Sequence, residues 1–291
     1  MAEEIKRLFQ EYREGKISRR EFMRQAIMIT GSLAAANGII GALAPTEATA
    51  AQVGENDPTI VTHNVRYQGK AGLVAAYLAR PVKAGKYPAV IVIHENAGLS
   101  DHIRDVARRL AKEGFVALAP DYLSRLGGTS LVTPKGEGIA KIREMVPWQT
   151  ITEDTESGFA YLKVLPDVRA DKQALIGFCW GGEMTFAAAT QIKSLDAAVV
   201  FYGRSPDPLD LVKNIRAPVM AHYGEKDPGV NKGIDETVAA MKKYNKGYDH
   251  KIYSGAQHAF NNDSNPKRYD AAAAKEAWGR TLDFLKKRLQ G

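Results

Sequence analysis

Short apolar runs, separated by segments long enough for a helix, constrain the fold of this chain more than any other feature. The runs show little polar alternation, which is typical of strands buried on both faces of a sheet. Strands that alternate with helices predict an α/β fold with a mainly parallel central sheet and helices on both faces. The predicted buried strands are residues 88–93, 115–120, 173–178, 197–202, 218–223 and 250–253, and the predicted helices are 103–113, 150–164, 234–244 and 268–289.

Two segments before the first buried run alternate apolar and polar residues. They span residues 59–67 and 72–78 and are joined by the polar connection 68–70. A period of two is typical of a strand with one buried face, and a short connection favours antiparallel pairing. We therefore expect a hairpin at one edge of the sheet.

The composition fits one globular domain with a large core, or one such domain with a tail. The chain has 291 residues, of which 45% are hydrophobic, and it carries a formal charge of +7 and a single cysteine. One cysteine excludes an internal disulfide. Basic residues are interspersed with acidic ones, without an aromatic-interleaved basic stripe, so we do not expect a nucleic-acid partner. The positive charge instead fits an anionic small-molecule substrate.

Residues 1–50 differ from the rest and resemble a twin-arginine export signal. Arg19 and Arg20 precede an uncharged, weakly apolar run at 26–45, and residues 48–50 form an Ala-Thr-Ala cleavage site. Residues 51–291 would then be the mature α/β domain, exported to the periplasm. The alternative is an amphipathic N-terminal helix with a linker in a cytoplasmic protein. Glycines and Asn37 within the run make a stable membrane span a poor third option.

The segment Gly-Phe-Cys-Trp-Gly at 177–181 follows one predicted strand and precedes a plausible helix. A strand, a tight turn and a helix in this order form a nucleophile elbow, in which the central side chain projects above the sheet. A Cβ at Gly177 or Gly181 would collide with the neighbouring strand and helix. A lone cysteine is commonly a buried apolar filler, but a filler does not need glycine on both sides. We therefore predict that Cys179 is a nucleophile.

Two further chemically apt residues follow later strands. Asp227 comes after the strand at 218–223, and His258 comes after the strand at 250–253. Sites in parallel sheets form at the carboxyl ends of the strands, so these residues are expected to meet Cys179. Nucleophile, acid and histidine occur in the order of an α/β-hydrolase triad. A metal site from His94, Glu95 and His222 is conceivable, but its spacing is not that of a ligand set, and we expect neither metal nor cofactor.

Four motifs together resemble the dienelactone hydrolase (carboxymethylenebutenolidase) family of α/β-hydrolases. They are Gly-Phe-Cys-Trp-Gly-Gly at 177–182, Gly-Glu-Lys-Asp-Pro-Gly-Val at 224–230, Ala-Gln-His-Ala-Phe at 256–260 and His-Glu-Asn-Ala-Gly at 94–98. The resemblance covers about residues 59–289. It implies an α/β-hydrolase fold with Cys179 as nucleophile, His258 as base and Asp227 as the carboxylate that orients the base.

The resemblance also implies roles for residues around the triad. Glu95 would contact the resting thiol and help to form the thiolate, and the backbone N–H groups of Asn96 and Trp180 would form the oxyanion hole. Arg125, in the loop that begins at Tyr122, would grip a substrate carboxylate. The substrate-binding set is therefore Tyr122, Arg125 and the residue four positions after the histidine.

That last position departs from the family pattern. The family member with dienelactone activity has a second arginine there, and this chain has Asn262. A neutral amide cannot form the bidentate charged pair that an arginine forms with a carboxylate. Half of the expected clamp is absent unless Arg204 or Lys267 replaces it.

These residues predict an enzyme that hydrolyses an ester or a lactone through an acyl-thioester on Cys179. A thiol nucleophile suits substrates with good leaving groups, such as enol lactones and activated esters. One alternative is a cysteine amidotransferase or peptidase, although these commonly place histidine directly after the cysteine, where this chain has Trp180. The other is a non-catalytic ligand-binding protein on the same scaffold.

Overall fold

The computed structural model describes residues 4, 7, 8, 11, 16, 17, 19–30, 51–132 and 137–291. The chain divides into two compact units, Met1–Ala50 and Ala51–Gly291. In the first unit, helix α2 (Arg19–Thr30) begins at the paired arginines and buries Phe22 and Ala26 in a small cluster with Leu8. Most of the predicted apolar run and the predicted cleavage site lie in 31–50, outside the described residues. None of the helices in the described ranges has both the length and the hydropathy needed to cross a bilayer.

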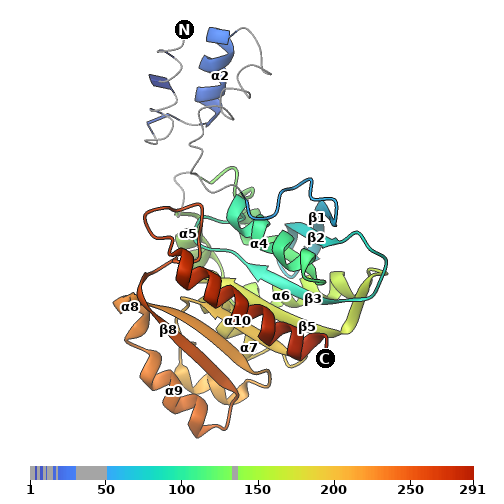
Figure 1. The fold of residues 1–291 in the computed structure, drawn as a ribbon, viewed down its shortest axis with the longest axis vertical. Coiled ribbons are helices and arrows are strands. Elements are labelled where there is room, and N and C mark those ends of the chain that lie inside the picture. The colour runs from blue at the N-terminus through green and yellow to red at the C-terminus, as the bar shows by residue number, and fades with distance from the viewer. Residues whose placement is uncertain are drawn as a thin grey trace. The chain divides into compact units, whose positions relative to one another are not determined.

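The second unit is built on an eight-stranded sheet with the order β1-β2-β4-β3-β5-β6-β7-β8 (Figure 1). Strand β2 pairs antiparallel with β1 and with β4, and the remaining neighbours are parallel. The edge hairpin and the mainly parallel sheet are therefore confirmed. The strands are β1 (Ile60–Gly69), β2 (Gly72–Pro81), β3 (Tyr87–Ile93), β4 (Val116–Asp121), β5 (Val168–Phe178), β6 (Ala197–Phe201), β7 (Val219–Lys226) and β8 (Tyr248–Gln257).

Helices cover both faces of this sheet, and two apolar clusters mark the two interfaces. On one face α4 and α10 pack against Val90, Val92 and Ile176, and on the other α5, α6, α7 and α9 pack against Ile91 and Leu175. Successive residues of β3 thus point into opposite clusters, as a strand buried on both faces requires. The helical segments are α4 (Asp101–Lys112), η1 (Tyr122–Leu126), α5 (Glu137–Met145), α6 (Trp148–Lys163), α7 (Trp180–Ala189), η2 (Leu209–Asn214), α8 (Pro228–Asn231), α9 (Ile234–Lys243) and α10 (Ala271–Leu289).

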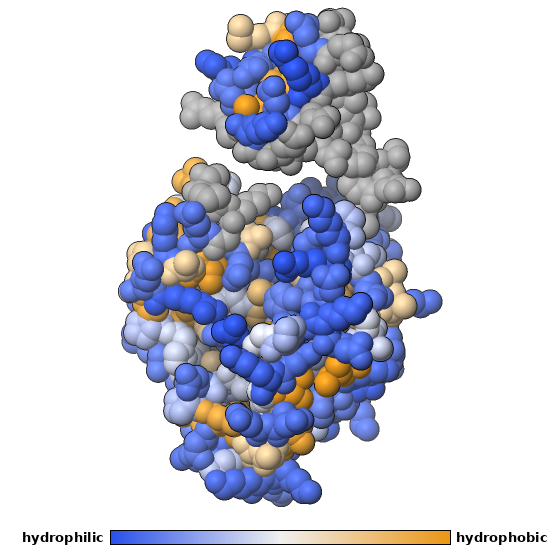
Figure 2. Space-filling model, turned by 90° about the vertical axis from the view of Figure 1, so that its left-hand side faces the viewer, coloured by the Kyte–Doolittle hydropathy of each residue, from blue (hydrophilic) through white to orange (hydrophobic). Residues whose placement is uncertain are grey.

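Apolar side chains concentrate in these two layers rather than on the surface. The face drawn in Figure 2 is mostly hydrophilic, with apolar side chains in small patches. The buried strands β3 and β5 end beside the elbow, because Ile93 pairs with Gly177 at the carboxyl ends of both strands. The packing of the core therefore places the candidate residues together at the carboxyl ends of the parallel strands.

Several element bounds differ from the sequence expectation. Strand β5 begins at Val168 rather than Gln173, and its polar first half pairs only at Tyr87 and Pro88 before the register shifts. Strand β8 runs on to Gln257, and most of its residues are exposed or half-exposed. Helix α5 was not predicted at all. In each case polar or mixed residues form a regular element because neighbouring strands or helices supply partners that the local pattern does not reveal.

Candidate active site

Cys179 lies at the turn between β5 and α7, in the geometry of a nucleophile elbow. Its backbone has φ 56° and ψ −117°, a combination that residues with a Cβ seldom adopt. A Cβ on Gly177 would lie 2.0 Å from the carbonyl oxygen of Gly181, and one on Gly181 would lie 2.2 Å from that of Ile93. The two glycines therefore permit the close approach of strand and helix that the turn needs.

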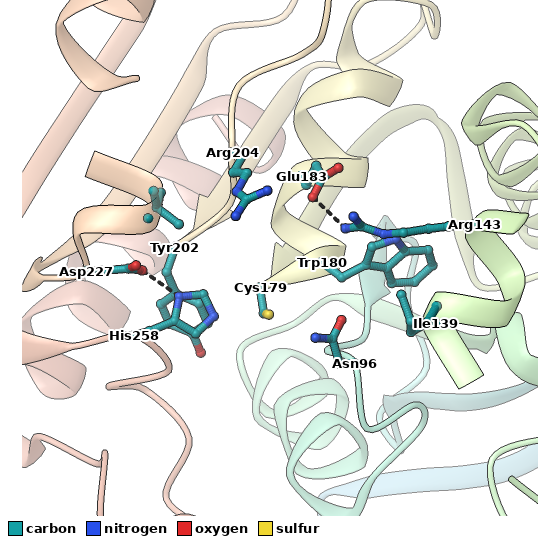
Figure 3. A pocket seen from close by; sticks show the side chains of 13 residues that line it. Asn96, Ile139, Arg143, Cys179, Trp180, Glu183, Tyr202, Arg204, Asp227 and His258 are labelled. Carbon is teal, nitrogen blue, oxygen red and sulfur yellow. Dashed lines mark hydrogen bonds and ion pairs between the residues drawn. The ribbon is translucent and has the colours of Figure 1, made fainter. Parts of the chain in front are cut away.

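His258 and Asp227 lie beside each other at the ends of β8 and β7. The Nδ1 of His258 is 2.5 Å from Oδ2 of Asp227, and because a carboxylate only accepts, Nδ1 is the donor. Burial lowers the pKa of His258, but the hydrogen bond that His258 donates to Asp227 and the adjacent Cys179 outweigh this effect and raise the pKa to about 10. In Figure 3 the imidazole lies between Asp227 and Cys179, so Nε2 is the nitrogen left for proton transfer in the pocket.

A pocket of about 390 Å³ brings five of the predicted residues together. Its volume lies in the range of small-molecule sites. Of the sequence-predicted set it is lined by Asn96, Cys179, Trp180, Asp227 and His258, and it also contains side chains that were not predicted, notably Arg143, Glu183 and Tyr202.

Asn96 and Trp180, the two residues expected to supply backbone N–H groups, line this pocket from different elements. Trp180 is the first residue of α7, so its N–H has no acceptor within the helix. Asn96 follows a peptide whose carbonyl, on Glu95, accepts hydrogen bonds from His94 Nδ1 at 2.8 Å and from the N–H of Gly98 at 3.0 Å. Because a trans peptide directs its C=O and N–H to opposite sides, fixing this carbonyl also fixes the direction of the Asn96 N–H.

The buried ring of His94 holds that loop in place. Its Nε2 accepts from the N–H of Tyr122 at 3.1 Å, so in the neutral ring Nδ1 carries the proton and donates to the Glu95 carbonyl. Burial lowers the pKa of His94, which favours this neutral form. The sequence had suggested His94 only as a conceivable metal ligand, and the described ranges contain no group of three or more residues that could hold a metal.

Glu95 is not among the residues that line the pocket. Its Oε1 accepts from the hydroxyl of Tyr202 at 3.1 Å and its Oε2 from Nδ2 of Asn262 at 2.6 Å, so both oxygens have partners other than Cys179. Burial and the nearby Glu95 carboxylate raise the pKa of Tyr202 well above its ordinary value, which keeps the hydroxyl as a donor. Asn262 thus contributes to the site by holding Glu95, not by lining the pocket.

Arg125 and Tyr122 also lie outside the residues that line the pocket. Arg125 forms an ion pair with Asp154 at 2.5 Å, and the fully buried Asp154 carboxylate requires such a cation. The buried hydroxyl of Tyr122 bonds to Oγ1 of Thr155 at 2.7 Å. Both side chains therefore link η1 to α6.

Two arginines take positions that the sequence did not clearly assign. Arg204 lines the pocket and points toward it in Figure 3, whereas Lys267 is not among the lining residues. Arg143, from α5, is 2.8 Å from Glu183 of α7 and lines the same pocket. No local motif marks Arg143 or Glu183. The only signal was that Glu183 falls four residues after Cys179, one helical turn along α7.

Comparison with known proteins gives a consistent result. The model of the family described as "Dienelactone hydrolase family" matches residues 74–289. A "Putative carboxymethylenebutenolidase" of Synechocystis is 35% identical over 75% of this chain and 93% of its own length. A "Probable 2-oxo-3-(5-oxofuran-2-ylidene)propanoate lactonase" of Bradyrhizobium is 37% identical over 74% of this chain and 90% of its own length. The crystal structure of a "Putative Dienelactone Hydrolase" from Klebsiella pneumoniae superposes with a TM-score of 0.73 at 31% identity, over 78% of this chain and 98% of that one.

Proposed function

The chain belongs to the dienelactone hydrolase family and is a hydrolase of ester or lactone bonds, and we propose that Cys179 is its nucleophile. The observation that carries the proposal is the pocket in which Cys179, His258 and Asp227 meet at three strand ends. His258 is the acid and base, and Asp227 orients its ring. The α/β-hydrolase fold expected from the sequence is the fold of the family.

The proposed reaction proceeds in two stages. The thiolate of Cys179 attacks the carbonyl carbon, and the carbonyl π electrons move to oxygen to give a tetrahedral oxyanion. When the adduct collapses, the C–O bond breaks, and protonated His258 gives its proton to the leaving oxygen. Neutral His258 then takes a proton from water, the hydroxide attacks the acyl-thioester, and collapse of the second adduct expels the thiolate with the free acid as product.

The N–H groups of Asn96 and Trp180 form the proposed oxyanion hole. Loss of one such donor typically costs a factor of about 10²–10³ in kcat. A tetrahedral adduct with a thiol can expel the thiolate in preference to a poor alkoxide leaving group. The proposal therefore favours enol lactones and activated esters over unactivated esters and amides.

An anionic group on the substrate is supported by Arg204. It lines the pocket, and no ion pair of this side chain is found among the described residues. A relative named as the lactonase of an oxofuranylidene propanoate acts, by that name, on an anionic lactone. We propose that Arg204 holds a substrate carboxylate in place of the missing arginine at Asn262.

Hydrolysis of an activated aryl ester tests the nucleophile. Cys179→Ala and alkylation by iodoacetamide should each reduce turnover by at least about 10³-fold, since the loss of a triad nucleophile removes most of the rate enhancement. Cys179→Ser serves as the matched control of similar size. A stoichiometric burst of the alcohol product would separate a catalyst from a binding protein. Activity that survives in Cys179→Ala would rule out this residue as nucleophile.

We further propose that residues 1–50 direct export by the twin-arginine route. The paired arginines at the start of α2 and the uncharged run after them support this. Fusion of residues 1–50 to a reporter should give periplasmic signal that is lost when Arg19 and Arg20 are both replaced by lysine. Export that persists in the lysine variant would contradict the proposal, and no export by either fusion would favour the cytoplasmic alternative.

A further inference from the structure

A second cavity of about 320 Å³ lies next to the catalytic pocket. The two share three lining residues, Arg143, Trp180 and Glu183. The walls of the second cavity are mainly apolar and come from α5, α6, α7 and the connecting residues 146–147 and 205–207, with Ile142, Val146, Trp148, Ile151, Met184 and Ala187 among them. A concave apolar space that continues from a reactive centre is suited to part of a substrate.

The boundary between the two cavities is the ion pair of Arg143 and Glu183. Their charges oppose each other at 2.8 Å, so the pair contributes little net charge to the second cavity. Asp207 is the other charged side chain in its wall. An anionic group would meet this carboxylate, and the described residues of the wall offer no unpaired cation to offset it, whereas a neutral apolar group would lose only water. The charge distribution therefore selects an uncharged hydrocarbon occupant.

The position of the cavity also decides which part of the substrate it takes. In Figure 3 His258 and the indole of Trp180 lie on opposite sides of Cys179. The leaving oxygen must face His258 to receive its proton, so the acyl substituent extends away from His258, toward Trp180 and the second cavity. We infer that this cavity is an acyl-binding subsite for a neutral alkyl or aryl group of medium length. The inference rests on the proposed function of Cys179 and specifies its substrate.

A series of p-nitrophenyl esters tests the subsite on the full-length protein. The leaving group stays constant while the acyl chain lengthens from acetate through butyrate to hexanoate. Each methylene that leaves water is expected to favour binding about three- to fourfold, so kcat/KM should rise at least about tenfold from acetate to hexanoate. The rates of the same esters with a small thiol in solution correct for intrinsic reactivity. A corrected kcat/KM that is flat or falls along the series would overturn the inference.

A filled cavity provides the second test. Ala187 lines the cavity but not the catalytic pocket, and Ala187→Phe should lower the hexanoate-to-acetate ratio of kcat/KM at least about tenfold. Ala272→Phe, on an exposed position of α10, is the matched control and should keep the parent ratio. Should Ala187→Phe not fold, Trp148→Ala enlarges the cavity and should raise the octanoate-to-hexanoate ratio of kcat/KM above that of the parent. Unchanged ratios in the folded cavity variants would overturn the inference.

Different results would overturn the acyl subsite and the proposed function of Cys179. Ester hydrolysis that depends on Cys179 but shows no chain-length preference would overturn the acyl subsite alone. Hydrolysis that persists in Cys179→Ala, or an absence of acyl-enzyme by mass spectrometry with every ester, would overturn the proposed function and the subsite with it.

Discussion

The side-chain amide of Asn262 donates a 2.6 Å hydrogen bond to Oε2 of Glu95, a residue 167 positions earlier in the chain. Tyr202 donates to the other oxygen of the same carboxylate. Asn262, at the position where the resemblance places an arginine, therefore holds the Glu95 carboxylate by a hydrogen bond. It fixes a buried glutamate next to the loop that carries the Asn96 N–H.

The variant Asn262→Asp tests this relationship. It keeps the side-chain oxygen that accepts from Ser264 but replaces the donor to Glu95 with a second carboxylate. We expect the free energy of unfolding at pH 7 to fall by about 1–3 kcal/mol, because a buried acceptor loses its partner. Urea unfolding of parent and variant at pH 7 measures the deficit, and an unchanged free energy of unfolding would contradict the prediction.

Replacement of His94 by phenylalanine should impair the proposed oxyanion hole. A flat ring is kept, but it can neither donate to the Glu95 carbonyl nor accept from the Tyr122 N–H, so the Glu95–Asn96 peptide keeps only the hydrogen bond from the Gly98 N–H. We expect kcat for an activated ester to fall about tenfold or more, with little change in KM, because the loss appears mainly in the transition state. The matching thionoester, whose sulfur is a weak acceptor, should be affected much less. Equal losses on both substrates would show general structural damage instead.

The raised pKa of His258, about 10, predicts how this residue affects stability. Burial lowers the pKa, and the Asp227 hydrogen bond and Cys179 more than offset that effect. A folded-state pKa above the unfolded value of about 6.5 gives a stabilisation that is complete below pH 6.5 and is lost as the pH rises toward 10. The stability advantage of the parent over His258→Gln should therefore decline between pH 6 and pH 10 in urea unfolding. An advantage that grows over this range would be the wrong sign.

The lowered pKa of Asp263 predicts a stability that falls, rather than rises, as the pH becomes acidic. Burial raises its pKa, but the hydrogen bond from His102 and the charge of Arg109 dominate and lower the pKa to about 2. Its stabilisation is therefore present above the unfolded value of about 3.9 and is lost as the pH falls toward 2. Asp263→Asn should be less stable than the parent at pH 7, with a gap that closes near pH 2. The exposed Asp283→Asn is the control, and a gap that persists at pH 2 would contradict the assignment.

The sheet and the order of the triad could be predicted because each depends on local sequence. Buried strands such as β3 are apolar throughout. The turn after β5 requires glycine at 177 and 181, because a Cβ at either position would collide with nearby backbone atoms. Residues that follow such strands must lie at one edge of a parallel sheet. Cys179, Asp227 and His258 were therefore placed together from sequence alone.

The side chains around the triad could not be predicted in the same way. Whether Arg125 reaches a substrate depends on Asp154, which α6 brings to it from 29 residues away. Arg143 meets Glu183 only because α5, absent from the expected elements, packs near α7. These ion pairs form only if the helices are placed to within the length of one side chain. The hydrophobic periodicity of the sequence predicts that a helix forms but not where it packs.

Under the proposed mechanism, catalysis and stability place opposite demands on Cys179. Cys179 holds a backbone conformation that costs of order 1–3 kcal/mol in any residue with a Cβ. Glycine would relieve that cost and delete the thiol in the same change. A chain of this type that had lost its activity would gain stability by drifting to glycine at the elbow. Without selection for activity, substitutions at this position would therefore favour the loss of the cysteine.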